Sequence, residues 1–435
     1  MSKNSQEHDD KRIDFKFGVP ELLYKQAGGR CSVPRCKNPT MGPFYEREGA
    51  VNMGVACHIH SASKNGPRGW GGKDAEFIGS ECNGIWCCQY HASLIDKASG
   101  FDYPAEVLFA WKALAEARTR KQMNDSPSPL GWVESIEFTS FLSLSPLPKL
   151  TLSRNTIMWG KSCCGKTALL EAAAAISQSK YSDRFNGTKT KGADGKYHPA
   201  TFCAKIIYST VDTLSKELNL MITGQKLTRL ESSILYILPP GDLEIVFCSE
   251  SDSHKLKSED DIDLMMRVLN VDKSALFALA SIGTKTIIPG EIKFEHAEEW
   301  DETNDIASPK HKEDGSPYYK LLFKMSPRAE FLPYANLSKS EKGRLIIDLL
   351  ITKAREISKQ RLTLLLIESL AINFDAGNFK SLLEALTNEE FQSVVSLPPI
   401  RENDVLDNFA GQPKLKKLEY LESWRLAIVG EKPDS

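Results

Sequence analysis

One short stretch of this chain restricts its fold more than any other. The segment WGKSCCGKT, at residues 159–167, contains the spacing G-x-x-x-x-G-K-T. An apolar run at 156–159 leads into it and an Ala/Leu-rich run at 168–176 follows, which predicts a strand, a tight loop and a helix. In such a loop the backbone N–H groups surround a phosphate, and the helix N-terminus adds its partial positive charge. The stretch therefore predicts a phosphate-binding P-loop.

The residues of this loop have separate roles in nucleotide binding. Gly160 and Gly165 let the backbone approach the phosphates closely. Lys166 is expected to reach the β- and γ-phosphates, and the Thr167 hydroxyl is expected to contact Mg²⁺. We therefore expect ATP and Mg²⁺ as cofactors and read the rest of the chain as attached to a nucleotide site.

Length and composition limit the remaining possibilities. A chain of 435 residues, 41% hydrophobic and 26% charged, is typical of a globular protein with two or three domains. There is no long apolar run for a membrane span and no apolar segment typical of a signal peptide, so a cytoplasmic location is expected. The net charge of −2 excludes a chain that coats nucleic acid by bulk charge alone.

The cysteines point to a metal site near the N-terminus. In a reducing compartment, clustered thiols are metal ligands more often than disulfides. Cys31 and Cys36 are separated by four residues, and Cys88 and His91 by two, so they can form the two knuckles of one tetrahedral Cys₃His zinc site. Cys87 competes with Cys88, which we prefer because of its spacing to His91. Such a site is closed, and its role is structural rather than catalytic.

Several short motifs lie between and after these knuckles. They are CHI at 57–59, AS at 62–63, GPR at 66–68, NGIWCC at 83–88, ID at 95–96, YP at 103–104, Leu108, WK at 111–112 and Glu116. Over about residues 28–118 this pattern resembles one subgroup of HNH endonuclease-like domains. The resemblance implies a ββα-metal hairpin in an N-terminal zinc module that spans residues 18–122 and ends in a trailing helix.

The HNH resemblance also implies catalytic roles. In active members the hairpin holds Mg²⁺ or a similar ion beside the scissile phosphate, so His58 would be the general base and Asn83 the residue that orients it. The chain departs from the pattern at Ala92, where a metal-binding His is expected, and at Cys57, where active members often carry an acid. A lone His also fits a half-buried structural residue. Two interpretations therefore stay open, a metal-dependent nuclease and a zinc-stapled module that recognises nucleic acid or protein.

Composition also indicates the boundaries of the domains. Residues 1–17 are charged and polar, which is typical of a flexible tail, and residues 123–131 have the composition of a linker. A second domain of short strands and helices is predicted over residues 132–435. Within it, residues 183–198 and 302–317 are rich in glycine or charge and predict a mobile loop and a solvated insert.

Two later motifs follow the P-loop in order. Residues 336–341 read NLSKSE, and the apolar run 364–367 ends in Glu368. The P-loop, the LSxSE motif and this strand together resemble the SMC-like branch of the ABC-type ATPases over about residues 132–430. In that family the signature loop of one subunit caps the nucleotide bound to another, which implies self-association through this domain, with a dimer as the active unit.

The ABC resemblance assigns individual roles as well. It implies that the Ser338 hydroxyl and the Ser340 backbone contact the γ-phosphate in the other subunit, and that Glu368 holds Mg²⁺ through water. Ser369 stands at the position of the catalytic Glu, and residues 397–398 stand where a switch His is usual. Because a serine cannot act as base for the attacking water, slow ATP turnover is expected.

The two resemblances together imply an α/β protein in which an HNH-like zinc module is fused to an ABC/SMC-type ATPase. This combination resembles Septu-like antiphage defence proteins, in which the two parts are separate chains. It implies a nuclease effector gated by ATP-dependent dimerisation, with nucleic acid as substrate (DNA rather than RNA) and a phage or defence protein as a further partner. Two alternatives remain, an ATP-binding switch with a catalytically inactive module and a DNA-maintenance ATPase without a defence role.

Overall fold

The chain divides into two compact units. The computed structural model describes residues 12–34, 36, 38–44, 47–124, 130–142, 144–191, 194–210, 213–231, 234–301, 306–409 and 412–430. Unit 1 is made of residues 1–126 together with 209–215, and unit 2 is made of residues 127–208 and 216–435. Among the described residues, no helix is both long and apolar enough to cross a membrane.

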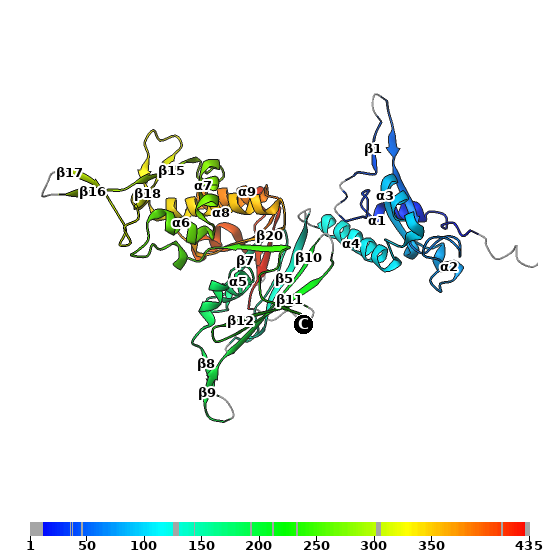
Figure 1. The fold of residues 1–435 in the computed structure, drawn as a ribbon, viewed down its shortest axis with the longest axis horizontal. Helices are drawn as coiled ribbons and strands as arrows, with labels where there is room; N and C mark the ends of the chain where they lie inside the picture. The colour runs from blue at the N-terminus through cyan, green and yellow to red at the C-terminus, as the bar shows by residue number, and fades with distance from the viewer. Residues whose placement is uncertain are drawn as a thin grey trace, which may run out of the picture. The chain divides into compact units, whose positions relative to one another are not determined.

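Unit 1, of which residues 12–124 are coloured blue to cyan in Figure 1, is built around an antiparallel strand pair that a helix follows. Its elements are α1 (Val19–Gln26), β1 (Met41–Pro43), β2 (Ala50–Asn52), β3 (Gly54–His58), α2 (Ala75–Ile78), the 3-10 turn η1 (Glu81–Asn83), β4 (Gly84–Cys88), α3 (Gln89–Leu94), the 3-10 turn η2 (Lys97–Gly100) and α4 (Ala105–Asn124). His58, at the end of β3, pairs with Gly84 at the start of β4. Ile85 and Ile95 are completely buried in a small core that packs on α4 through Leu108.

The segment before α1 is held against unit 1. The backbone N–H of Ile13 donates to the carbonyl of Ala62 at 2.9 Å, and that of Lys16 donates to the carbonyl of Gly79 at 2.9 Å. The predicted flexible tail is therefore wrong for residues 12–17, because these contacts offset the entropy that ordering costs. The residues before them lie outside the described part of the chain.

The predicted linker is shortened at both ends. The trailing helix implied for the N-terminal module corresponds to α4, which continues to Asn124, and β5 already begins at Gly131. Residues 125–129, which lie between them, are outside the described residues.

Unit 2 contains a five-stranded parallel sheet in the order β14-β20-β21-β7-β24, which confirms the predicted α/β class. These strands are β14 (Leu243–Phe247), β20 (Leu362–Ile367), β21 (Gln392–Ser396), β7 (Asn155–Trp159) and β24 (Trp424–Ile428). Alternate residues of β20 enter opposite cores. Leu364 and Leu366 pack in the core that contains α5 (Lys166–Ala174), whereas Leu365 and Ile367 pack with α8 (Lys339–Ser358) and α9 (Ala376–Thr387). The sheet is therefore buried on both faces, as its continuous apolar strands require.

A second sheet covers the other side of α5. Its strand order is β13-β12-β11-β10-β5-β6, and its apolar face shares a core with that helix. The strands are β5 (Gly131–Ser140), β6 (Lys149–Thr151), β10 (Thr201–Thr210), β11 (Lys216–Thr223), β12 (Lys226–Glu231) and β13 (Ile234–Tyr236). The P-loop helix therefore lies between two sheets, which fixes the direction of its N-terminus.

Further elements of unit 2 flank α8 or project from the body of the unit, and the short hairpin of β22 (Leu406–Phe409) and β23 (Gln412–Leu415) precedes β24. The flanking elements are α6 (Asp261–Leu269), α7 (Lys273–Ile282), β15 (Gly290–His296), β18 (Tyr319–Met325) and β19 (Leu332–Pro333). Two hairpins, β8–β9 (Lys189–Lys191 and Tyr197–Pro199) and β16–β17 (Glu298–Asp301 and Ile306–Pro309), project outward in Figure 1. The loop predicted at 183–198 and the irregular insert predicted at 302–317 are therefore corrected, because the first contains β8 and the start of β9 and the second contains β17, the partner of β16.

Candidate nucleotide and metal sites

The P-loop connects β7 to α5 as a tight left-handed turn. Cys163 and Gly165 have positive φ angles of 62° and 89°. A Cβ atom on Gly160 would come within 2.6 Å of the Val429 carbonyl oxygen, so only glycine fits there. Gly165 is the N-cap of α5 and has no side chain to bond the first N–H groups of the helix. These groups are free to face an anion, which is the feature that a phosphate site needs.

Three side chains from two distant segments meet beside this loop. The Lys166 Nζ donates hydrogen bonds to the carbonyls of Gly160 at 2.5 Å and Lys161 at 2.8 Å, so the lysine folds back over the loop. The Thr167 hydroxyl donates to the Glu368 carboxylate at 2.5 Å, although the two residues are 201 positions apart. Burial raises the pKa of Glu368, and the Thr167 hydrogen bond opposes that rise. These oxygens are of the hard type that Mg²⁺ prefers.

A cavity of about 430 Å³ opens at this point, within the size range of small-molecule sites. It lies past the carboxyl ends of β7, β20 and β21, the usual place for a ligand in a parallel α/β sheet. Its walls are formed by Trp159, Gly160, Lys161, Ser162, Lys166, Glu368, Ile372, Ser396, Leu397, Pro398, Pro399 and Glu402.

The residues of the signature motif take a different position. Ser338 is the N-cap of α8, and its hydroxyl accepts a hydrogen bond from the Glu341 N–H at 3.2 Å. The Glu341 carboxylate accepts in return from the Ser338 N–H at 2.9 Å, which completes a capping box. Neither Ser338 nor Ser340 is among the residues that line the P-loop cavity of the same chain. Their predicted contact with a nucleotide in another subunit stays a prediction.

Two positions lack the hydrolysis residues of the ABC family, that of the catalytic Glu and that of the switch His. Ser369 begins the short 3-10 turn η6 (Ser369–Ala371), and its side chain lies outside the described part of the chain. Leu397 and Pro398, which occupy the switch position, line the cavity. Glu402, in α10 (Glu402–Val405), also lines it and was not anticipated from the sequence. No sequence motif includes this glutamate, which is separated from β21 by a proline-containing turn.

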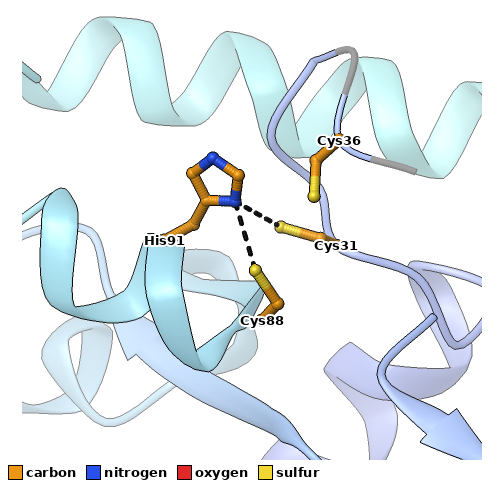
Figure 2. Close-up of side chains that lie close together, drawn as sticks. All are labelled: Cys31, Cys36, Cys88 and His91. Atoms are coloured by element: carbon orange, nitrogen blue, oxygen red, sulfur yellow. Dashed lines mark hydrogen bonds between the residues drawn. The ribbon is translucent and has the colours of Figure 1, made fainter. Parts of the chain in front are cut away.

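The four predicted zinc ligands lie together in unit 1. Their ligand atoms are all within 4.8 Å of one another, and they are Cys31, Cys36, Cys88 and His91. The His91 Nδ1 is 3.2 Å from the Cys88 Sγ and 3.6 Å from the Cys31 Sγ, and Figure 2 shows these groups turned toward a common point. Three thiolates and one imidazole form a donor set that suits a tetrahedral Zn²⁺.

Cys87 does not belong to this set of four. It is fully buried in β4 and contacts the thiols of Cys31 and Cys57. These contacts and burial raise the pKa of the Cys87 thiol. The structure thus places Cys88, rather than Cys87, with the other three ligands, because successive side chains of a strand point to opposite faces.

His58, the predicted base, is covered by an aromatic ring. It stacks on Phe15 with ring centroids 3.7 Å apart and planes tilted by 8°. Its Nε2 is buried without a hydrogen-bond partner among the described residues. Burial, aided by the charge of Arg12, lowers the pKa of His58, so the neutral imidazole is favoured. Among the described residues, the only group of His, Cys, Asp or Glu arranged for a metal is the Cys₃His set, and His58 is outside it.

Asn83, the predicted orienting residue, acts on the chain after His58. Its fully buried side chain accepts from the His60 N–H at 2.8 Å and donates to the carbonyls of His60 at 2.9 Å and Ile78 at 3.1 Å. It therefore holds the loop that follows β3 by its backbone. No hydrogen bond joins the Asn83 side chain to the His58 ring within the described part of the chain.

Arg68 is a structural residue to which the sequence assigned no role. Its side chain donates to the carbonyls of Ile59 at 2.6 Å, Ile95 at 2.7 Å and His58 at 3.4 Å. It also forms an ion pair with Asp96 at 2.5 Å, while its own side chain is only 5% exposed. The GPR and ID motifs thus meet in space, and this guanidinium fixes the end of β3. The two motifs were visible in the sequence, but nothing there showed that they pair.

No family model and no curated protein matches the chain. Among solved structures, an Smc head bound to the C-winged helix domain of ScpA shows 12% identity, covers 66% of this chain and 97% of that chain, and has a TM-score of 0.41. The recombination mediator protein RecF with ATP shows 14% identity, 66% and 99% coverage and a TM-score of 0.40. The SMC head domain from Thermotoga maritima shows 11% identity, 66% and 99% coverage and a TM-score of 0.35.

Proposed function

We propose that this chain is an ATP-binding switch whose nucleotide state controls the association of two copies and, through it, the N-terminal zinc module. One observation carries the proposal. Lys166, at the uncapped N-terminus of α5, and Glu368 line one cavity at the carboxyl ends of parallel strands, and the Thr167 hydroxyl is bonded to the Glu368 carboxylate. A cation, free N–H groups, a hydroxyl and a buried acid together can bind a nucleoside triphosphate and its metal ion.

The pair of Thr167 and Glu368 is the proposed Mg²⁺ site. The Thr167 hydroxyl donates a hydrogen bond to the Glu368 carboxylate at 2.5 Å, so the two groups lie close enough to serve one ion. Bound Mg²⁺ takes oxygen ligands and keeps several waters, so it would bind the Thr167 hydroxyl, a phosphate oxygen and waters that contact Glu368. Lys166 would exchange its two carbonyl contacts for phosphate oxygens, which form stronger charge-assisted hydrogen bonds.

Association of two copies is supported by the placement of the signature motif. Ser338 and Ser340 lie at the start of α8 and do not line the P-loop cavity of their own chain. Under the proposal they close the nucleotide site of a second copy, as the ABC resemblance implies. The resulting dimer brings two zinc modules under the control of ATP.

The proposed output is recognition of nucleic acid, DNA rather than RNA, or of a partner protein. The Cys₃His set is a closed donor set, so a bound Zn²⁺ would stabilise the module without taking part in chemistry. The covered His58 and the absence of a second metal-type cluster among the described residues favour binding over cleavage. Thiol ligands must stay reduced, which fits the expected cytoplasmic setting.

The second candidate function is a metal-dependent nuclease of antiphage defence, gated by the same ATP switch. The order β3, β4 and α3, with His58 at the end of β3, favours it because this is the ββα arrangement of the HNH resemblance. Its test is a cleavage assay with Mg²⁺ or Mn²⁺ on DNA and RNA, with and without ATP. Equal background from the wild type and His58→Ala would exclude the nuclease and leave the binding function.

The switch itself is tested by nucleotide binding and mass. We expect calorimetry to give a Kd for Mg²⁺·ATP that rises about 100-fold in Lys166→Ala, equivalent to about 2.7 kcal/mol for a lost charge-assisted contact. Light scattering should detect a larger particle with ATP in the wild type and not in Lys166→Ala. Lys189→Ala, an exposed lysine of hairpin β8–β9, is the matched control. Unchanged binding by Lys166→Ala, or equal particle mass with and without ATP, would contradict the proposal.

A further inference from the structure

ATP turnover in this chain needs a base that the family motif does not supply. The water that attacks a γ-phosphate must lose a proton to a nearby group, and a carboxylate is the usual acceptor. The residue at the motif position of the catalytic acid is Ser369, which has no such group. A carboxylate from elsewhere in the fold would have to reach the same cavity.

The acidic side chains around the nucleotide cavity are few. Of the residues that line it, all of them described, only Glu368 and Glu402 are acidic. Glu368 is bonded to the Thr167 hydroxyl, the pair proposed to hold Mg²⁺. Glu402 is half-buried, and its carboxylate has no ion pair or hydrogen bond within the described part of the chain. It is therefore the one lining carboxylate that is free to accept a proton.

The segment that carries Glu402 is fixed beside the P-loop strand. The Leu397 N–H donates to the Met158 carbonyl in β7 at 2.9 Å, and the Arg401 N–H donates to the Pro398 carbonyl at 2.8 Å. Two successive prolines restrict the backbone between these bonds, and Val405 anchors the end of α10 in the core without any exposed surface. These contacts fix the backbone position from which the Glu402 side chain reaches the cavity, and a fixed position of the reacting group is what preorganised catalysis requires.

We propose that Glu402 is the general base for ATP hydrolysis in this chain, an inference that rests on the proposed function. The Glu402 carboxylate takes a proton from water while the water oxygen forms a bond to the γ-phosphorus. The bond from that phosphorus to the β,γ-bridging oxygen breaks, and the electron pair leaves with ADP. The products are ADP and inorganic phosphate, and the proton passes from Glu402 to solvent. Glu402, which follows β21, thereby takes the role of the acid that is missing at Ser369, after β20.

The test compares carboxamide variants of the full chain in phosphate-release and ATP-binding assays. We expect Glu402→Gln to lower kcat about 100-fold or more, with KM and the Kd for ATP within about twofold of the wild type. Glu402→Asp should retain part of the activity. Asp404→Asn is the matched control, since this carboxylate lies in the same helix, is paired with Arg401 at 2.8 Å and does not line the cavity.

Each result separates this inference from the function on which it rests. Wild-type kcat in Glu402→Gln would overturn the role of Glu402, as would ATP binding by the wild type with no turnover at all. In either case the switch would stand, because binding is intact. A wild type that does not bind ATP would overturn the switch and the base together. An equal loss of kcat in Asp404→Asn would also overturn the assignment, because it would indicate a structural effect of α10.

Discussion

The candidate nucleotide site and the predicted nuclease site were both inferred from short sequence motifs, but the structure brings together the side chains of only the first. In unit 2, Thr167 and Glu368 come from segments far apart in the sequence and meet at 2.5 Å. In unit 1, His58 lies beneath Phe15, and Asn83 bonds the backbone of His60. A motif therefore predicts a binding site well when the backbone of the motif itself supplies the binding groups. A P-loop brings its own N–H groups and helix, whereas a nuclease hairpin depends on ligands from elsewhere.

The largest expected effect concerns the Cys₃His set, whose four ligands lie together in unit 1. Cys88→Ser or zinc chelation should unfold unit 1, because structural zinc contributes about 10–16 kcal/mol in small zinc domains. The parallel sheet of unit 2 contains no part of the site, so ATP binding should persist. Limited proteolysis combined with ATP calorimetry measures both. Cys82→Ser, an exposed cysteine of the same unit, is the control, and a protease-resistant unit 1 in Cys88→Ser would contradict the zinc assignment.

A smaller effect is expected at Arg68, which fixes the strand end that carries His58. Arg68→Ala leaves buried carbonyls and Asp96 without their donor, so the free energy of unfolding should fall by about 3–5 kcal/mol. Arg12→Ala breaks an exposed ion pair with Asp14 and should change it by less than about 0.5 kcal/mol. Urea denaturation with zinc present compares them. Equal effects of the two variants would show that Arg68 does not hold this site together.

The proposed nucleotide site is expected to lower the stability of the folded protein. Burial raises the pKa of Glu368, so the folded apo protein binds more protons than the unfolded chain between the two pKa values. Stability from this group is therefore present at low pH and lost as pH rises through that window. Glu368→Gln should slightly raise the melting temperature of the nucleotide-free protein at neutral pH. We expect Mg²⁺ to raise the melting temperature of the wild type but not that of Glu368→Gln. A melting temperature that still rises with Mg²⁺ in Glu368→Gln would show that the metal binds elsewhere.

The smallest expected effect tests whether the cover on His58 matters. Phe15→Ala exposes the imidazole, so the pKa of His58 should rise toward its ordinary value near 6.5. In the wild type the lowered pKa means that stability from this group is lost as pH falls through the unfolded and then the folded value. An NMR titration of the histidine resonances measures the shift, with Phe17→Ala, an exposed phenylalanine, as control. New metal-dependent cleavage by Phe15→Ala would favour the nuclease.

Local elements were the part of the structure that sequence patterns predicted well. The strand, loop and helix of the P-loop appear as β7 and α5, and the apolar run before Glu368 appears as the buried strand β20. The projecting hairpins β8–β9 and β16–β17 were missed because their strands are only three or four residues long and show no regular alternation of apolar and polar residues. The order of residues 12–17 was missed because it depends on hydrogen bonds to residues far along the chain.

The sequence by itself determined the features that need only neighbouring residues. The G-x-x-x-x-G-K-T spacing and the Cys-x₄-Cys and Cys-x₂-His spacings each specify a local backbone turn and its donors. Only the tertiary structure decided which distant groups meet. In the folded protein Glu368 bonds Thr167, and Phe15 stacks on His58. Glu402 lines the cavity beside the P-loop, although no motif in the sequence indicated that it would. The reason is physical, because side-chain convergence depends on how strands are ordered and buried, and that order is set by the packing of the whole core.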